Sequence, residues 1–143
     1  MAALVYQEDV IKWIKEQIHF EEVCGEANGN TGPDLILQIN NEKIYFEAIA
    51  YTKKPKGKNQ SDFWKAFSQA ISRLNPNSIY GKPDYIVLAL PMNFWRGWRE
   101  RTRILGKGVW KSIGDTFPQL CIWFVGNEEI KQFAWNESYD AVR

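Results

Sequence analysis

Two acidic residues stand at positions where a carboxylate has to be explained. Asp34 opens an apolar run, and Glu47 lies thirteen positions further on, inside a second apolar run between Phe46 and Ala48. Burying a carboxylate costs several kcal/mol unless the group is paired, hydrogen-bonded or bound to a metal ion. A strand face open to water, or a lysine beside Glu47, would also account for the pattern. The spacing alone leaves these interpretations open.

The elements that must position the two carboxylates follow from hydrophobic periodicity. Apolar residues recur at helical spacing over 7–18, and strands are expected over 22–27, 34–39 and 43–51. Turn-forming residues separate these strands, which predicts an antiparallel meander. The two carboxylates then belong to neighbouring strands, where we expect them to converge and to point away from the helix-covered face.

The rest of the chain predicts a mixed α/β domain. The remaining elements are, in order, a helix over 61–74, a buried strand over 84–90, a basic, Trp-rich and partly helical segment over 93–111, and a hairpin of strands over 120–125 and 130–135. Ser61 is a credible N-cap of the second helix, and Pro91 is expected to close the buried strand. With no repeat or long linker, 1–143 is interpreted as a single domain.

The corner Gly32-Pro33-Asp34, followed by a strand, a turn and the run Tyr45-Phe46-Glu47-Ala48-Ile49-Ala50-Tyr51, resembles the PD-(D/E)XK nucleases. That family has the restriction-endonuclease-like fold, whose core runs helix, three-strand meander, helix, strand. The same order is expected here, followed by a C-terminal helix and β-hairpin. The resemblance therefore covers most of the chain, although the motif itself is short.

The resemblance implies phosphodiester hydrolysis with Mg²⁺ or Mn²⁺. Asp34 and Glu47 would be metal ligands with catalytic roles, and the backbone carbonyl of Ala48 would add a third oxygen. Many members also use a glutamate early in the first helix, a place that Glu8 matches in order. Asp9 competes for that role, and both residues also suit a solvated helix N-terminus.

Ile49 departs from the family pattern, because the family has a lysine two residues after the glutamate. Alternation puts residue 49 on the same strand face as Glu47, so an ammonium group has to come from elsewhere. Lys53 is about 20 Å away along an extended strand. Lys65 is expected to face solvent, whereas Lys58, in the loop before the second helix, could fold over the pocket.

Gln60 is a further catalytic candidate. The spacing Gln60-x-x-x-Trp64 is similar to a Gln-x-x-x-Tyr element that some members of the superfamily carry at the entry of the second helix. An ordinary capping or loop role explains the residue equally well. Position and pattern leave both open.

Charge is segregated along the chain, although the formal net charge is only +1. Residues 1–50, 51–111 and 112–143 carry −6, +10 and −3. A basic block of this size is typical of a nucleic-acid-facing surface if its side chains converge, with DNA as the expected partner. The candidate contacts are Lys53, Lys54, Lys56, Arg96, Arg99 and Arg103. Solvated loops, and an amphipathic helix whose Trp95, Trp98 and Trp110 are core residues, are the alternatives.

Several other classes of protein are disfavoured. His19 is the only histidine, and the chain has no glycine-rich nucleotide-binding motif. Cys24 and Cys121 are far apart and are expected to be buried free thiols. We expect no membrane contact and a cytoplasmic location, because the start of the chain lacks a signal-peptide pattern and no apolar run approaches the length of a membrane span.

Two hypotheses from different classes therefore remain. The first is a metal-dependent nuclease, most simply a DNA endonuclease. The second is a catalytically degraded nuclease fold that binds nucleic acid or protein, which Ile49 favours. The small size also leaves open a homodimer or a partner recognition subunit.

Overall fold

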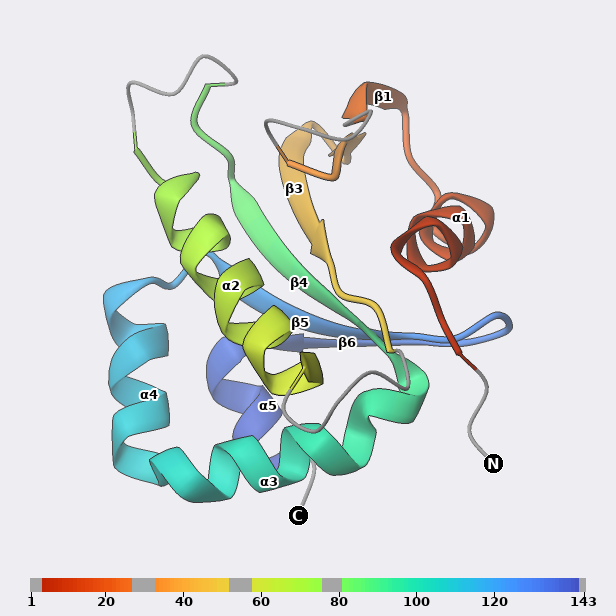
Figure 1. Ribbon diagram of the computed structural model, residues 1–143. Helices are drawn as coiled ribbons and strands as arrows, with labels where there is room; N and C mark the ends of the chain where they lie inside the picture. Colours follow the sequence, from red (N-terminus) through yellow and green to blue (C-terminus); the bar gives the residue numbers. More distant parts are fainter. Residues whose placement is uncertain (1–3, 27–32, 52–57, 76–80, 142–143) are drawn as a thin grey trace.

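The computed structural model describes residues 4–26, 33–51, 58–75 and 81–141, without the side chains of 58–62, 95–97 and 101. These residues form a mixed six-stranded sheet (Figure 1). Its strands lie side by side in sequence order: β1 (Glu22–Glu26), β2 (Leu35–Ile39), β3 (Glu42–Ala48), β4 (Tyr85–Pro91), β5 (Leu120–Val125) and β6 (Ile130–Ala134). The predicted α/β class is confirmed.

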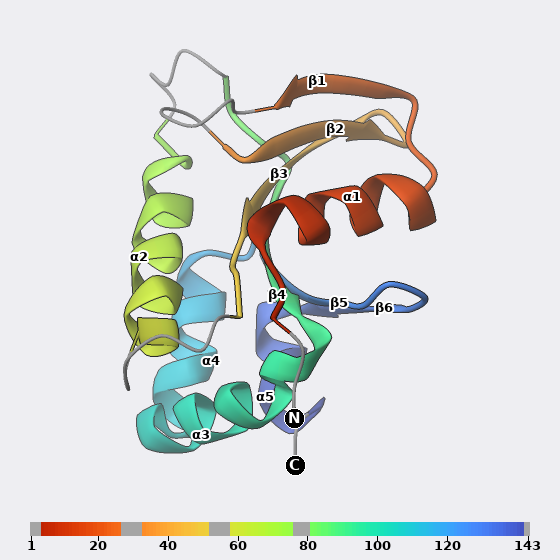
Figure 2. The same cartoon turned by 45° about the vertical axis from the view of Figure 1, so that its right-hand side comes forward.

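Helices cover both faces of this sheet. They are α1 (Gln7–Gln17), α2 (Lys58–Ser72), the 3₁₀ helix η1 (Met92–Phe94), α3 (Trp95–Leu105), α4 (Lys107–Thr116) and α5 (Trp135–Ala141). Figure 2 shows α1 on one side of the sheet and α2, α4 and α5 on the other. The result is a three-layer arrangement of helix, sheet and helix. Among the helices of the described residues, none has the length and apolar character needed to cross a membrane.

Strand pairing follows the sequence expectation closely. β1, β2 and β3 pair antiparallel, which confirms the predicted meander, and β5 and β6 pair antiparallel, which confirms the predicted hairpin. β4 pairs parallel with both β3 and β5. Such parallel connections need a crossover segment. Helix α2 supplies it between β3 and β4, and α3 with α4 supplies it between β4 and β5.

Side-chain alternation divides the apolar residues between two cores. On β4, Val87 and Ala89 pack with α1, whereas Ile86, Leu88 and Leu90 pack on the side of the other helices. The buried residues of β4 therefore form a continuous apolar run, as expected for a central parallel strand. Both faces of the sheet are consequently dry over β3, β4 and β5.

Two tryptophans of the basic segment and Trp135 of α5 belong to the larger of these cores. Trp98, Trp110 and Trp135 are almost fully buried, and the last two stack with ring centroids 4.2 Å apart and an interplanar angle of 10°. Trp110 Nε1 donates to the Trp135 carbonyl at 3.1 Å, and Trp135 Nε1 donates to the Trp110 carbonyl at 2.8 Å. The core alternative is thus correct for Trp98 and Trp110.

A glycine permits this close packing of α4 on α5. A Cβ atom at Gly114 would lie 2.0 Å from Asn136 Oδ1 and 2.8 Å from Trp135 Cδ1. Contacts that short require a shift of the second helix, because atoms cannot approach so closely. Only glycine therefore fits at this crossing without rearrangement.

The structure also corrects some expectations. Helix α2 begins at Lys58, so Ser61 lies inside the helix and is not its N-cap. Pro91 is the last residue of β4, paired with Val125, instead of lying beyond the strand. Cys24, on the edge strand β1, is exposed, which corrects the buried thiol expected there, whereas Cys121 is partly buried. Both cysteines are free thiols, as predicted.

Candidate functional site

Strand register brings Asp34 and Glu47 together. Leu35 of β2 pairs with Phe46 of β3, so Asp34, immediately before β2, lies across from Glu47. Alternation gives both acidic side chains the same sheet face as Ile36 and Tyr45. The predicted convergence of the two carboxylates on neighbouring strands therefore agrees with the pairing.

Asp34 is anchored to the strand that carries Glu47. Its Oδ2 accepts a hydrogen bond from the backbone N–H of Ala48 at 2.8 Å. Burial raises the pKa of Asp34, and the Ala48 hydrogen bond and the charge of Arg73 oppose that rise. The loop corner before β2 thus holds a desolvated carboxylate at a defined place on the sheet.

Glu47 is almost fully buried, with 2% of its side chain exposed, and it has a cationic partner. Arg73 Nε donates to Glu47 Oε1 at 3.0 Å. Burial and the charge of Asp34 raise the pKa of Glu47 to about 7, although the hydrogen bond and charge of Arg73 act in the opposite direction. A proton on this carboxyl is therefore held much more tightly than on an exposed glutamate.

The expected orientation of the two carboxylates was wrong. Glu47 does not point away from the helix-covered face, because it shares the face of Tyr45 and Ile49, which pack in the core on the α2 side. The reason is that helices cover both faces of the sheet, so an open strand face does not exist at β3. A carboxylate at this position needs a partner, and Arg73 provides it.

Position 49 is closed to a charged group in this fold. Ile49 is 1% exposed and belongs to the core beneath α2. Lys65 is exposed on α2, as predicted, and so does not replace the lysine that the resemblance expects. Among the described residues, Arg73 is the basic group that bonds to Glu47, and its charge also lowers the pKa of Asp34 against the effect of burial.

Sequence reasoning missed Arg73. It follows the last residue of α2, and its backbone N–H still bonds to the carbonyls of Gln69 and Ala70. The sequence offered two signals. One was a basic residue near a helix C-terminus, which suits the helix dipole, and the other was a glutamate within an apolar run, which calls for a partner. Neither signal says that these residues, 26 positions apart, meet.

Helix α1 reaches the site through a neighbour of the residue that was expected. Gln7 Nε2 donates to the Ala48 carbonyl at 2.9 Å, the same carbonyl that the resemblance nominates as a ligand. Glu8 is exposed on the same turn. Within the described ranges, no group of three or more His, Cys, Asp or Glu side chains could hold a metal ion.

Several predicted residues cannot be placed at the site. Lys53, Lys54 and Lys56 lie outside the described residues. Lys58 and Gln60 belong to the first turn of α2, which corrects the loop expected at Lys58, but their side chains are outside the description. Their proposed roles stay predictions.

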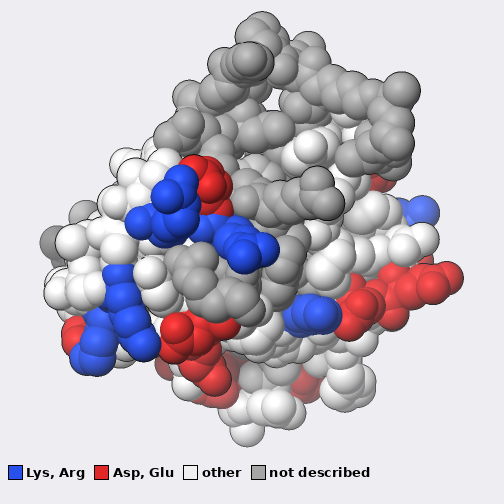
Figure 3. Space-filling model, turned by 90° about the horizontal axis from the view of Figure 1, so that it is seen from below, with Lys and Arg blue, Asp and Glu red and all other residues white. Residues whose placement is uncertain are grey.

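The basic segment does not form a uniformly positive surface in its described part. Arg99 and Arg103 are exposed on α3, and Arg103 forms an ion pair with Glu100. Lys111 likewise pairs with Asp115 at 2.7 Å. On the face seen in Figure 3, blue and red side chains occur together in small groups. The side chain of Arg96 lies outside the description.

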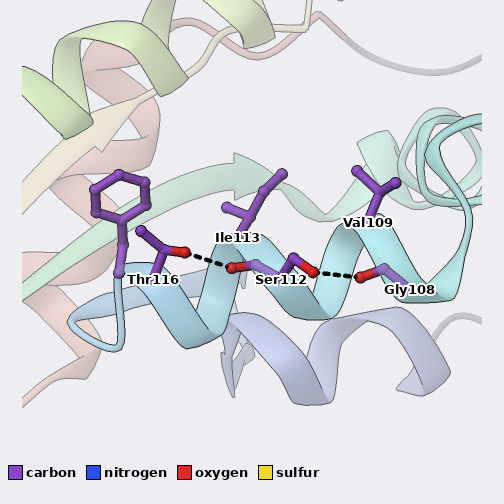
Figure 4. Close-up of a pocket in the computed structure, with 6 residues that line it drawn as sticks. Gly108, Val109, Ser112, Ile113 and Thr116 are labelled. Atoms are coloured by element: carbon purple, nitrogen blue, oxygen red, sulfur yellow. Dashed lines mark hydrogen bonds between the residues drawn. The ribbon is translucent and has the colours of Figure 1, made fainter.

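A shallow depression on α4 lies apart from the carboxylates. It is lined by Gly108, Val109, Ser112, Ile113, Thr116 and Phe117 (Figure 4). Its two hydroxyl groups bond back to the helix, Ser112 to the Gly108 carbonyl at 3.0 Å and Thr116 to the Ser112 carbonyl at 2.8 Å. It contains no titratable side chain, so it offers no acid–base chemistry.

The donor set fits a small divalent cation. Carboxylate and carbonyl oxygens are the ligands that Mg²⁺ prefers, and Asp34, Glu47 and Ala48 present all three within one stretch of paired strand. The charge of Asp34 raises the pKa of Glu47, which is the repulsion that a cation between them would relieve. A cation would share the Glu47 carboxylate with Arg73 and the Ala48 carbonyl with Gln7, because these oxygens already accept hydrogen bonds.

Comparisons with known proteins give no family for the chain. No family model matches it, and neither a curated protein nor a solved structure matches it. The proposal of a function therefore depends on the site itself.

Proposed function

We propose that the protein hydrolyses phosphodiester bonds of nucleic acid, with DNA as the first substrate to test, in a reaction that depends on Mg²⁺ or Mn²⁺. The observation that carries the proposal is the pairing of half-buried Asp34, directly before β2, with almost fully buried Glu47 on β3, beside the Ala48 carbonyl. Keeping two desolvated carboxylates together costs free energy unless they bind something. Arg73 offsets only part of that cost, because the pKa of Glu47 is still raised to about 7, and a bound cation would offset more of it.

Each residue of the site has a role in this proposal. The carboxylates of Asp34 and Glu47 and the carbonyl of Ala48 would hold the cation, and the Ala48 N–H orients Asp34. The cation supplies polarisation of a phosphoryl oxygen and a more acidic water molecule. Gln7 positions the Ala48 carbonyl through its hydrogen bond of 2.9 Å. Lys58, Gln60 and Glu8 remain candidate contributors from the two helices.

The order of elements supports the same proposal. Helix α1, the meander of β1 to β3, helix α2 and the parallel strand β4 follow one another as the restriction-endonuclease-like core expects. The two carboxylates lie where that core would carry them, at the start of its second strand and within its third. This support comes from the arrangement and not from sequence similarity.

A second candidate is a nucleic-acid-binding module without catalysis. It is favoured by Ile49, whose place in the core excludes the expected ammonium group, and by Arg73, which neutralises Glu47 in the absence of metal. In that case the acidic pair is a structural remnant held by an ion pair. Product formation separates the two candidates.

Cleavage should depend on both carboxylates. We expect the wild-type protein to nick plasmid or oligonucleotide DNA with Mg²⁺ or Mn²⁺, and Asp34→Asn and Glu47→Gln to lose about a hundredfold to a thousandfold in rate, because a charged metal ligand contributes several kcal/mol. Glu16→Gln, on the exposed side of α1, is the matched control and should cleave normally. A wild type that binds DNA but gives no product with either metal would favour the binding module.

Binding of DNA should depend on the exposed arginines of α3. Replacing Arg99 and Arg103 together by glutamate should weaken binding and reduce the slope of log K against log salt, because each lost phosphate contact removes about 0.9 from that slope for duplex DNA. Lys131→Glu, on the opposite edge strand β6, is the control. If the slope of log K against log salt were the same in the wild type and the double variant, these arginines would not contact the phosphates. Fluorescence polarisation over a range of salt concentrations measures the effect.

A further inference from the structure

Within the described part of the chain, the guanidinium group of Arg73 bonds to Glu47 through one of its three nitrogens. Its Nε donates to Glu47, and its side chain is 19% exposed, so it reaches the solvent from a largely buried position. Among the described residues, no hydrogen bond uses its two Nη groups. A guanidinium fork with free N–H donors is the side-chain geometry that best matches the paired oxygens of a phosphate.

Arg73 also acts on both acidic side chains, by contact with Glu47 and through its charge on Asp34. Its charge opposes the effect of burial on the pKa of Asp34, and it bonds directly to Glu47. Its backbone is held by the last turn of α2, where its N–H bonds to the carbonyls of Gln69 and Ala70. The long side chain can therefore change partner while its attachment to the fold stays in place.

The charges of this cluster predict how it treats a phosphate. One guanidinium faces two carboxylates, so an ionised cluster without metal carries excess negative charge and repels a phosphodiester. Asp34 and Glu47 would hold a divalent cation, whose charge would make the cluster positive. Glu47 Oε1, which accepts from Arg73 Nε at 3.0 Å, would then be shared between the cation and Arg73.

We propose that Arg73 exchanges partners, leaving Glu47 for a phosphate oxygen of the substrate when a divalent cation occupies the two carboxylates. The proposal rests on the nuclease function proposed above, and it assigns to Arg73 the contact that a lysine at position 49 would have made. Ile49 cannot serve, because it is buried in the core. Phosphate binding and cation binding are then coupled through one side chain.

The test is cation-dependent binding of a labelled oligonucleotide, measured by fluorescence polarisation. Ca²⁺ replaces Mg²⁺, because it takes the same oxygen ligands with looser geometry and keeps binding separate from cleavage. We expect Ca²⁺ to raise wild-type affinity at least tenfold over EDTA and Arg73→Gln to lose that gain. Lys65→Gln removes one exposed cation from α2, the helix that Arg73 follows, and should keep the gain.

Two further measurements separate binding of phosphate from a merely structural ion pair. Calorimetric titration with Ca²⁺ alone should show that Arg73→Gln binds the cation at least as tightly as wild type, because it no longer competes for Glu47. If Arg73→Gln does not fold, Arg73→Lys keeps the charge without the fork and should retain only part of the Ca²⁺-dependent gain.

Each outcome decides the proposal. A full Ca²⁺-dependent gain in Arg73→Gln or Arg73→Lys, or no gain in wild type, would overturn the exchange of partners. Wild-type cleavage together with an unchanged gain in the Arg73 variants would leave the nuclease function standing and remove Arg73 from it. A gain that depends on Arg73 in a protein that never cleaves would support the exchange and contradict the nuclease.

Discussion

Replacing Trp110 by alanine is expected to lower the free energy of unfolding by about 4 to 5 kcal/mol, the upper end for a buried aromatic residue. Its side chain is fully buried. Its ring centroid lies 4.2 Å from that of Trp135, in a stacked arrangement, and 4.9 Å from that of Trp98, in an edge-on arrangement. Its indole N–H also donates hydrogen bonds to the Trp135 carbonyl and to Ser138 Oγ. A domain has about 5 to 15 kcal/mol in total, so much of the stability depends on this residue.

Urea unfolding followed by circular dichroism measures the loss. Trp110→Phe is the matched control, because it keeps an aromatic ring in the stack and removes the N–H donor, at an expected cost of about 1 to 2 kcal/mol. If the free energy of unfolding of Trp110→Ala lay within about 1 kcal/mol of the wild-type value, the packing of α4 on α5 would not be a major source of stability.

Replacing Glu47 by glutamine should abolish a pH dependence of stability. Burial, together with the charge of Asp34, raises the pKa of Glu47 from 4.5 to about 7 in the folded protein, so the folded state binds the proton more tightly than the unfolded state. The wild type is then most stable below about pH 4.5 and loses about 3 kcal/mol as the pH rises to about 7, where the carboxyl ionises.

Glutamine stays neutral and can still accept the hydrogen bond of Arg73. Glu47→Gln should therefore show little of this loss and be more stable than wild type at pH 8, by up to about 3 kcal/mol. Urea unfolding between pH 4.5 and pH 8, with EDTA present, measures the difference. Glu16→Gln should follow the wild-type curve. Parallel curves for wild type and Glu47→Gln would show that Glu47 is not desolvated.

Local patterns were sufficient to predict most of the sheet. Alternation and turn residues predicted the meander and the final hairpin, and the register that follows from them brought Asp34 across from Glu47. The continuous apolar run of 84–90 predicted a buried strand, and β4 is buried on both faces. These features depend on residues that are close in sequence, so the hydrophobic periodicity is enough to predict them.

Features that depend on distant packing could not be predicted. Which of the basic residues meets Glu47 is decided by how α2 docks on β3, and no local pattern encodes that docking. The orientation of Glu47 was wrong for the same reason, because periodicity does not reveal that helices cover both faces. Helix α5 was missed since Trp135 continues a strand-like run, although Glu137 accepts from the Ala134 N–H as a helix-capping residue does.

The order of the strands has a consequence for how the chain assembles. Because β1, β2 and β3 each pair with a neighbour in sequence, their contacts are local and do not require α2. In a three-stranded meander without α2, Glu47 would be hydrated and would need no counter-ion. Arg73 follows α2 directly, so the helix that buries Glu47 also brings its cationic partner.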